Sequence, residues 1–239
     1  MERDLLTNSS RVVVKFGTGI LTNRSKQIDP GQVEQLVAQV AAQRQAGREV
    51  VVVSSGAVGA GMGALGMTQR PADLSDLQAC AAIGQLKLMA AYSELFAKHD
   101  LQVAQVLLTH DDLEHRERHL NARNTLVSLL EKGVVPIVNE NDAVSYTELK
   151  FGDNDWLAAL VACLLPADLL VVLTTVDGLV ENFGKKNPRT IPLVETIDAD
   201  IKKLAGGTLS ATAVGGMEAK LRAAKMKALG LEHVRLTQG

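Results

Sequence analysis

The chain has 239 residues, of which 46% are hydrophobic but only 3% aromatic, and its formal net charge is −2. This length suits one α/β domain, and a core of Val, Leu, Ile and Ala is typical of parallel strands covered by helices. Because the chain has no basic footprint and no apolar run near the ~20 residues that span a bilayer, we expect a cytoplasmic protein that binds neither nucleic acid nor membrane.

Strand and helix signals alternate from one end of the chain to the other. Asp29 before Pro30 predicts the start of a helix that ends near Gly47. Ser75 and Gln78 have the spacing of a capping box at the start of a long helix. The predicted strands cover 12–14, 49–53, 103–108, 134–138, 169–173, 191–194 and 231–236, and the other predicted helices cover 75–98, 120–131, 155–164, 198–204 and 216–229.

This alternation predicts an α/β fold, a three-layer αβα sandwich with a mostly parallel central sheet. Ligands of such sheets bind at the carboxyl ends of the strands. Four loops that follow predicted strands are rich in Gly, Ser, Thr, Asn, Asp or Lys, namely 15–19, 54–57, 139–142 and 174–178. One such loop alone is typical of an ordinary turn, but four at one sheet edge predict a ligand site.

Lysine and glycine come together at two places that could hold phosphate. Lys15 ends the first strand and is followed by Gly17 and Gly19, while Gly215-Gly216 precedes Lys220 by about one helical turn. Backbone N–H groups beside glycines and the lysine ammonium group both bind phosphate oxygens. The chain has no G-x-x-x-x-G-K-[ST] segment, so this is not a P-loop. Local evidence alone also allows a solvated lysine at a strand end.

Two polar loops have side chains suited to recognising an amino acid. The run Asn139-Glu140-Asn141-Asp142 offers carboxylates for an ammonium group and amides for a carboxylate. Gly152-Asp153-Asn154-Asp155 opens a predicted helix, so Asp153 or Asn154 could instead be its N-cap. Anions for an ammonium group, combined with lysines for a phosphate donor, predict phosphoryl transfer to an amino acid.

Three other patterns have simpler explanations. The G-x-G-x-x-G at 61–66 does not directly follow a strand, as a dinucleotide fingerprint must, so we interpret its glycines as close helix packing or a turn. The histidines and carboxylates of 110–119 lack metal-ligand spacing and include two arginines, which favours a solvated, salt-bridged helix start. Cys80 and Cys163 lie in Ala-rich helical stretches, and we expect small buried hydrophobes without a disulfide.

Six segments, in order along almost the whole chain, resemble the amino-acid-kinase family. They are V-V-V-K-F-G-T-G, S-S-G-A-V, L-N-A-R-N-T-L, V-P-I-V-N-E-N-D-A-V, G-D-N-D and G-G-M-E-A-K. Within the family, the pairing of N-E-N-D-A-V with G-D-N-D is similar to the glutamate 5-kinases and to the kinase half of pyrroline-5-carboxylate synthase. The resemblance implies transfer of the ATP γ-phosphate to the side-chain carboxylate of L-glutamate, which gives glutamyl 5-phosphate in the first step of proline biosynthesis.

The resemblance also implies a role for each matching residue. Lys15 and Lys220 would stabilise the transferring phosphoryl group, and Asp155 would orient both lysines. Mg²⁺ would be bound largely through the ATP phosphates, without dedicated metal ligands from the protein. Glutamate would be held by Ser55, Asn139, Asp142 and Asn154, and ATP by Lys15, Gly17, Thr174, Thr175, Val214, Gly215, Gly216, Met217 and Lys220.

The nucleotide side departs from the family's usual residues, which are Thr-Asp or Ser-Asp where this chain has Thr174-Thr175. We expect a single amino-acid-kinase domain over 1–239, without the PUA domain that many bacterial members carry. A homo-oligomer, dimer or tetramer, and channelling of the product to glutamyl phosphate reductase are further implications. Two alternatives stay open: a catalytically weak homologue that senses glutamate or proline, and a kinase of the same fold for another carboxylate or a carbamate.

Overall fold

The computed structural model describes residues 8–23, 27–145, 154–184, 186–205, 216–225 and 233–238. In this part of the chain, a central sheet has the strand order β3-β4-β2-β1-β5-β8, and every neighbouring pair of strands is parallel. Apolar residues dominate most of these strands, so both faces of the sheet need cover. The strands are β1 (Arg11–Phe16), β2 (Glu49–Ser54), β3 (Val103–Leu108), β4 (Val135–Glu140), β5 (Leu169–Thr174) and β8 (His233–Gln238).

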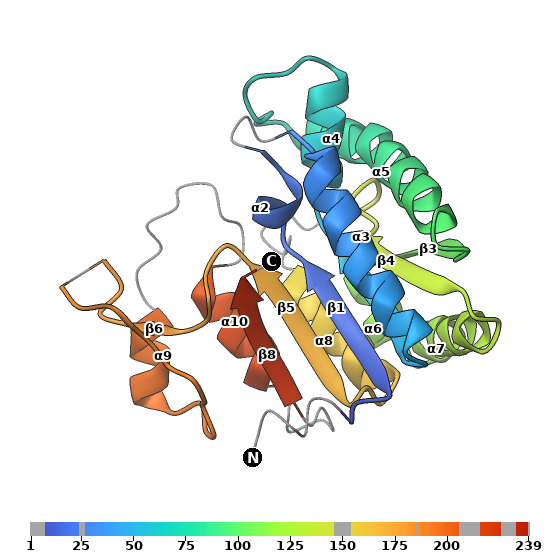
Figure 1. Cartoon of the computed structure of the whole chain (residues 1–239). Helices are drawn as coiled ribbons and strands as arrows, with labels where there is room; N and C mark the ends of the chain where they lie inside the picture. Colours follow the sequence, from blue (N-terminus) through green and yellow to red (C-terminus); the bar gives the residue numbers. More distant parts are fainter. Residues whose placement is uncertain are drawn as a thin grey trace.

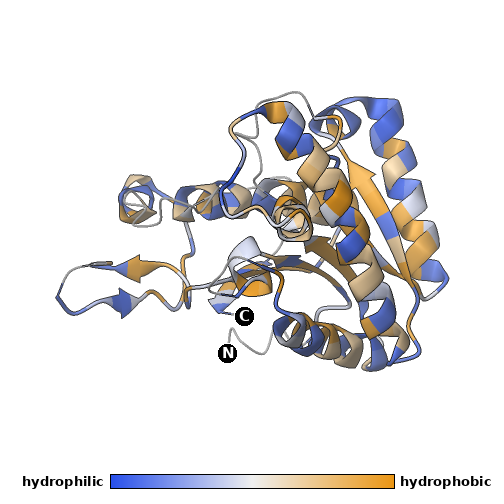
Figure 2. Ribbon diagram, turned by 90° about the horizontal axis from the view of Figure 1, so that it is seen from above, coloured by the Kyte–Doolittle hydropathy of each residue, from blue (hydrophilic) through white to orange (hydrophobic). Residues whose placement is uncertain are grey.

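Helices cover both faces of this sheet (Figure 1). In β1, Val12 and Val14 face one layer and Val13 faces the other, because side chains alternate along a strand. Seen from above in Figure 2, hydrophobic strands lie between helices whose residues are of mixed hydropathy. The predicted αβα sandwich with a parallel sheet is confirmed. Its layers are α3 (Pro30–Gln45) and α5 (Leu74–Ala97) on one face, and α7 (Arg116–Glu131), α8 (Asn154–Leu164) and α10 (Met217–Ala224) on the other.

A small hairpin and a short helix extend beyond the β8 side of the sheet (Figure 1). The predicted strand at 191–194 is wrong, because Pro192 has no N–H to donate to a strand ladder and the hairpin pairing ends at Thr190. Ile191 and Val194 pack instead into a small apolar cluster with residues of the neighbouring helices. The elements are β6 (Val180–Glu181), β7 (Arg189–Thr190) and α9 (Ala199–Ala205).

Two short helices that we did not predict follow strands β1 and β2, and they are α2 (Thr18–Leu21) and α4 (Ala57–Ala64). Helix α4 crosses α5 at very close range. A Cβ at Gly61 would lie 1.8 Å from the carbonyl oxygen of Cys80, and a Cβ at Gly84 would lie 1.8 Å from that of Ala57. Since no side chain fits at either glycine, the two helices touch through their backbones. The interpretation of the 61–66 glycines as close helix packing is confirmed for Gly61.

The start of α5 differs from the prediction. The helix begins at Leu74 with Asp73 as its N-cap, so Ser75 and Gln78 already lie inside it and the expected capping box is wrong. The Gln78 amide donates instead to the backbone oxygen of Ser145 at 3.0 Å. That hydrogen bond ties α5 to the loop after β4.

Residues 110–119 form the short helix α6 (His110–Glu114) and the first turn of α7. Thr109 and Asp112 make a reciprocal capping box at the start of α6. Arg118 lies 3.4 Å from a carboxylate oxygen of Asp112. The prediction of a salt-bridged helix start is therefore confirmed, although α7 begins earlier than expected.

The two cysteines lie in helices of opposite layers and do not form a disulfide, as expected. Cys80 is buried in α5, whereas Cys163 in α8 is partly exposed, so the expectation of full burial holds for Cys80 alone. Of the helices in the described ranges, none is long and apolar enough to cross a membrane.

Candidate active site

The polar loops predicted at the sheet edge lie together. Strands β4, β2, β1 and β5 are neighbours, so their carboxyl ends bring together segments that are far apart in the sequence. The first residues of α8 enter the same region. Several polar residues there are more than nine-tenths buried, among them Ser55, Asn139, Asn154 and Asp155. Burial of polar groups costs free energy unless they are paired, so their partners define what this region can bind.

One buried carboxylate holds the two predicted lysines. Nζ of Lys15 lies 2.7 Å from Oδ1 of Asp155, and Nζ of Lys220 lies 2.8 Å from Oδ2. The lysines come from β1 and α10, at opposite ends of the chain, and only about a tenth of each side chain is exposed. The structure thus brings Lys15, Lys220 and Asp155 together as the sequence predicts. We call these three residues the lysine cluster.

The charges of the lysine cluster keep Asp155 ionised. Burial alone would raise the pKa of the Asp155 carboxyl, but the ammonium groups of Lys15 and Lys220 outweigh burial and hold this pKa below its usual value. Within the lysine cluster, two cations face one anion. A positive, largely buried cluster at the edge of a sheet favours an anionic ligand such as phosphate.

Gly17 leaves room beside the Lys15 ammonium group. Its N–H donates to the backbone oxygen of Leu173 at 3.3 Å, which holds the loop after β1 against β5. A Cβ at Gly17 would lie 3.1 Å from that oxygen and 3.6 Å from Nζ of Lys15. A larger residue would therefore crowd both the β5 backbone and the ammonium group.

The other residues predicted to bind ATP belong to elements next to the lysine cluster. Thr174 ends β5. The next residue, Thr175, packs against α2, since a Cβ at Gly19 would lie 2.8 Å from Cγ2 of Thr175. Gly216 is the N-cap of α10 and Met217 is the first residue of that helix. Val214 and Gly215 lie outside the described residues.

A second cluster, beside the first, is built from amide side chains. Nδ2 of Asn154 donates to the backbone oxygen of Ser54 at 2.9 Å, to Oγ of Ser55 at 2.9 Å and to Oδ1 of Asn139 at 3.0 Å. Nδ2 of Asn139 in turn donates to Oε1 of Gln85 at 2.8 Å. We call Ser55, Gln85, Asn139 and Asn154 the amide cluster. Its hydrogen bonds show that the Asn154 amide links the start of α8 to the carboxyl ends of β2 and β4.

The amide cluster has one acceptor to spare. Oδ1 of Asn154 is buried and has no hydrogen-bond partner among the residues that the structure describes. A buried acceptor without a donor costs about 1–3 kcal/mol, so a ligand that brings an N–H or O–H group to this oxygen would recover that free energy.

Three members of the amide cluster, Ser55, Asn139 and Asn154, line a cavity that is also lined by Glu140, Asp142 and Arg70. Burial, and to a lesser extent the neighbouring Asp142, raises the pKa of Glu140 to about 7. Burial likewise raises the pKa of Asp142 to about 6, although Arg70 acts in the opposite direction. Neither carboxylate forms an ion pair with a described residue, so both favour an incoming positive group such as an ammonium.

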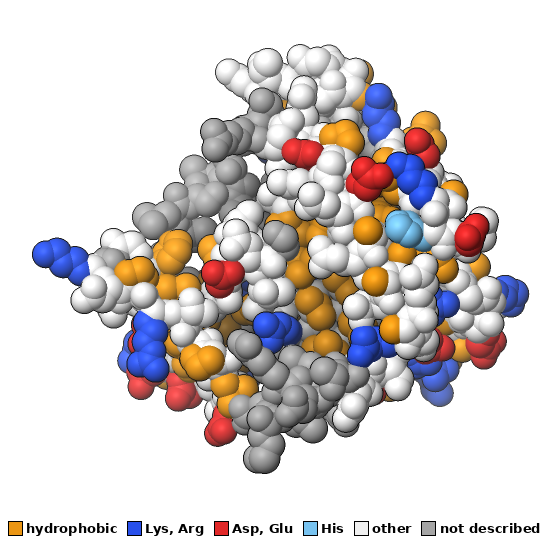
Figure 3. Space-filling view, viewed as in Figure 1, with side chains coloured by type: hydrophobic (Ala, Val, Ile, Leu, Met, Phe, Trp, Pro, Cys, Tyr) orange, Lys and Arg blue, Asp and Glu red, His pale blue; other side chains and the backbone are white. Residues whose placement is uncertain are grey.

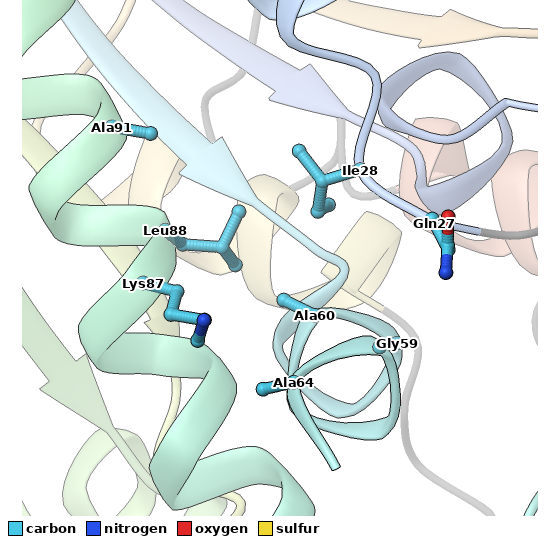
Figure 4. Close-up of a pocket in the computed structure, with 9 residues that line it drawn as sticks. Gln27, Ile28, Gly59, Ala60, Ala64, Lys87, Leu88 and Ala91 are labelled. Atoms are coloured by element: carbon cyan, nitrogen blue, oxygen red, sulfur yellow. The ribbon is translucent and has the colours of Figure 1, made fainter. Parts of the chain in front are cut away.

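A larger hollow, between α4 and α5, lacks this chemistry (Figure 4). Its volume is about 220 Å³, against about 80 Å³ for the cavity at the amide cluster. Figure 4 shows Ile28, Ala60, Ala64 and Leu88 around it, with Lys87 at its edge and no carboxylate. Charge and hydrogen bonding, not size, therefore identify the cavity suited to an amino acid.

Charged groups elsewhere do not form a comparable site in the ranges that the structure covers. No three His, Cys, Asp or Glu side chains there are grouped so that they could hold a metal ion. On the face seen in Figure 3, acidic and basic side chains are scattered over the surface instead of being gathered by sign. The two buried clusters remain the candidate active site.

Sequence reasoning missed two residues of this site. Gln85 orients Asn139, and a signal for it exists, because Leu77, Ala81 and Gln85 recur at helical spacing on the buried side of α5. A polar residue on such a stripe is a candidate for a buried hydrogen-bond network. Arg70 lies in the loop between α4 and α5, and no pattern in the sequence marks it.

The family model described as Amino acid kinase family matches residues 10–230. That range contains both clusters and every strand of the central sheet except β8. The chain belongs to the amino acid kinase family. The lysine cluster of this amino acid kinase lies at the carboxyl ends of the strands, which is where parallel α/β sheets generally bind their ligands.

Two curated relatives of this amino acid kinase have the same name. A protein of Azoarcus sp. (strain BH72) named "Glutamate 5-kinase" is 47% identical over 239 residues, which are 99% of this chain and 64% of that protein. A "Glutamate 5-kinase" of Pseudomonas savastanoi pv. phaseolicola (strain 1448A / Race 6) is 49% identical over 236 residues, with 98% and 64% covered. The chain therefore spans 64% of the length of these relatives.

Solved structures share the fold at low sequence identity. Carbamate kinase from Giardia lamblia bound to AMP-PNP has a TM-score of 0.66 and 17% identity, with 97% of this chain and 93% of that chain covered. UMP kinase from Ureaplasma parvum has a TM-score of 0.61 and 16% identity, with 97% and 90% covered. At such identities the likeness shows the fold alone.

Proposed function

We propose that this chain acts as a glutamate 5-kinase, which transfers the γ-phosphate of ATP to the side-chain carboxylate of L-glutamate and yields glutamyl 5-phosphate. One observation carries the proposal: Asp155 holds two lysines, and the adjacent Asn154 centres the amide cluster. A cationic cluster for phosphate thereby lies next to a cavity with anions for an ammonium group. Relatives of that name at 47% and 49% identity support the same reaction.

Glutamate would bind in the cavity lined by Ser55, Asn139, Asp142 and Asn154. Its ammonium group would donate to Oδ1 of Asn154, the buried acceptor that has no described partner, and Asp142 would balance its charge. Oγ of Ser55 already accepts a hydrogen bond from Asn154, so its own proton remains to donate to a substrate carboxylate.

ATP would bind so that its γ-phosphate meets the lysine cluster. Phosphoryl transfer is catalysed mainly by positioning and by positive charge around the transferring group, which Lys15 and Lys220 would supply while Asp155 positions them. Mg²⁺ would be bound largely through the phosphates and would neutralise part of their charge. We assign the rest of the nucleotide site to Gly17, Thr174, Thr175, Val214, Gly215, Gly216 and Met217.

The acceptor needs no general base, because it is already a carboxylate. One oxygen of the glutamate side chain attacks the γ-phosphorus, and a new P–O bond forms. The bond from that phosphorus to the β,γ-bridging oxygen breaks, and ADP leaves with the electron pair. The charge that develops on the bridging oxygen is what the two ammonium groups would stabilise.

The test is ATP- and Mg²⁺-dependent formation of a hydroxamate from glutamate and hydroxylamine, with aspartate and N-acetylglutamate as controls. Hydroxamate from glutamate alone is the expected result. Glutamate binding without turnover would instead indicate a sensing homologue, and turnover with a control alone would indicate a kinase for another carboxylate.

We also propose that residues 1–239 form one amino-acid-kinase domain in a cytoplasmic homo-oligomer, a dimer or a tetramer. Acyl phosphates are attacked by water, so direct transfer of the product to a glutamyl phosphate reductase would protect it. Light scattering of the purified protein gives the oligomeric state, and a mass of one chain would contradict this part of the proposal.

A further inference from the structure

Arg70 stands apart from the other charged groups of the amide-cluster cavity. Among the lining residues that the structure describes, it is the one cation, and it faces a cavity that also contains Glu140 and Asp142. It comes from the loop between α4 and α5, which is neither a strand end nor part of the lysine cluster. No sequence pattern assigns it a role.

The surroundings of Arg70 leave its guanidinium group available. It is exposed and makes no hydrogen bond or ion pair with any residue in the described ranges. It is nevertheless close enough to Asp142 to act against the rise of that residue's pKa. An arginine offers five N–H donors in a planar fork that fits a carboxylate with two parallel hydrogen bonds.

The charges of an amino-acid substrate can be matched to this cavity one by one. At neutral pH, glutamate carries one ammonium group and two carboxylates. Its side-chain carboxylate has to face the lysine cluster, where the phosphoryl group arrives. Its ammonium group suits Asn154 and the carboxylates at Glu140 and Asp142. The α-carboxylate is then the one charge without an oppositely charged protein partner, and Arg70 is the one cation among the described lining residues.

We propose that Arg70 binds the α-carboxylate of the substrate and thereby selects substrates in which that carboxylate is free. This inference rests on the proposed glutamate kinase activity and adds a substrate-binding residue to it. Arg70 would bind the α-carboxylate while the neighbouring acidic residues bind the ammonium group. This pattern of charges would fix which carboxylate of glutamate reaches the lysine cluster.

The experiment compares glutamate with isoglutamine, in which the α-carboxylate is a neutral amide and the side-chain carboxylate is unchanged. In the hydroxamate assay, we expect the wild type to prefer glutamate by about 10- to 100-fold in kcat/KM, the range of a charge-assisted hydrogen bond. Arg70→Gln should raise KM for glutamate by a similar factor, leave kcat within about twofold, and remove most of the preference. Arg70→Lys, which keeps the charge but loses the fork, should fall between the two.

The matched control is Lys87→Gln, which removes an exposed cation from the edge of the other hollow and should change nothing. An Arg70→Gln variant that keeps the wild-type preference for glutamate would overturn the inference and leave the kinase proposal intact. If the wild type makes no hydroxamate, the kinase proposal fails, and calorimetry with glutamate still decides on Arg70. Equal affinity of the wild type and Arg70→Gln, or no binding to the wild type, would then overturn the inference.

Discussion

Asp155 and the pair Glu140 and Asp142 lie at the same edge of the sheet, yet their pKa values are shifted in opposite directions. Burial raises all three pKa values, but at Asp155 the Lys15 and Lys220 ammonium groups reverse the effect. At Glu140 and Asp142 no described cation makes such a contact, and the pKa values stay raised to about 7 and about 6.

The comparison shows how two neighbouring sites, each with buried carboxylates, come to favour ligands of opposite charge. The anion at Asp155 is already satisfied, so its cluster offers surplus positive charge to an incoming phosphate. The carboxylates of Glu140 and Asp142 form no ion pair with a described residue, so their cavity offers negative charge to an incoming ammonium group. Neighbouring cations, more than burial, therefore decide whether each site suits an anionic or a cationic group.

The largest expected effect comes from removing one cation of the lysine cluster. Lys220→Ala should lower kcat by about 10³-fold, because it removes charge that acts on the transition state. Glutamate affinity should stay within about twofold, since Lys220 does not line the amide-cluster cavity. Steady-state kinetics and calorimetry measure the two quantities separately.

Lys225→Ala, at the C-terminal end of the same helix, is the matched control and should leave both quantities unchanged. If Lys220→Ala stayed active, the proposal that the lysine cluster stabilises the transferring phosphoryl group would be wrong.

Removing the shared anion should affect stability. Asp155→Asn leaves two lysine ammonium groups close together without their counter-ion, and we expect a loss of about 3 kcal/mol in the free energy of unfolding. Since the folded-state pKa of Asp155 is lowered, its stabilising contribution is fully present above the ordinary carboxyl pKa of 3.8 and is lost as pH falls through the folded-state value.

Urea unfolding of the wild type and Asp155→Asn at pH 7 and in acid measures this contribution. The difference between the two proteins should be large at pH 7 and should shrink below about pH 4. A difference that does not depend on pH would mean that Asp155 is not the ionised partner of both lysines.

A packing change between α4 and α5 should affect the amide-cluster cavity and not the lysine cluster. A Cβ at Gly61 would lie 1.8 Å from the carbonyl oxygen of Cys80, so Gly61→Ala should push α4 away from α5 and cost about 2 kcal/mol of stability. Residues at the start of α4 line the amide-cluster cavity, so glutamate affinity should fall as well.

Gly63→Ala, two residues along the same helix, is the matched control. The nearest atom to its Cβ would be Cγ of Gln27 at 3.8 Å, so this variant should be neutral or up to about 1 kcal/mol more stable. Thermal unfolding and glutamate titration of both variants make the comparison. Equal behaviour of the two would contradict the close contact of α4 and α5.

The smallest expected effect is the pH dependence of glutamate binding. An ammonium group binds an ionised carboxylate, so affinity should rise as pH increases through the pKa of Asp142 near 6 and that of Glu140 near 7. Below pH 6 we expect affinity to fall by up to about tenfold per pH unit for each proton that has to be lost.

Calorimetry between pH 5.5 and 8 tests this slope, with Asp142→Asn as the control that should flatten it. Affinity that stays constant over this range would mean that neither carboxylate meets the substrate's ammonium group.

Much of this arrangement could be predicted from the sequence, because most of the site residues lie at strand ends and helix starts. The β-branched run before Lys15 and the apolar run before Asn139 placed both residues at the carboxyl edge of a parallel sheet. The position of Lys220 could be predicted because this residue lies about one turn into a helix. Those residues lie where backbone periodicity puts them, and periodicity is visible in the sequence.

The rest depends on tertiary contacts that leave weak marks in the sequence. Helix α4 is rich in glycine, which usually weakens a helix, and it is held by its contact with Gly84 of α5. Arg70 reaches the cavity from a loop, and nothing in the residues around it fixes the direction of that loop. The prediction of a strand at 191–194 was wrong because it relied on the apolar pattern and gave too little weight to Pro192, which has no N–H to donate.

The central claim, that a side-chain carboxylate accepts the phosphoryl group at the lysine cluster, can be tested by an isotope. Glutamate labelled with ¹⁸O in its side-chain carboxylate is incubated with ATP, Mg²⁺ and hydroxylamine, and the inorganic phosphate released is examined by ³¹P NMR. Attack of hydroxylamine on the acyl carbon should release phosphate that carries one ¹⁸O from the carboxylate. Phosphate without ¹⁸O, at a rate equal to ATP consumption, would mean that the acceptor is water or another group, and would contradict the account.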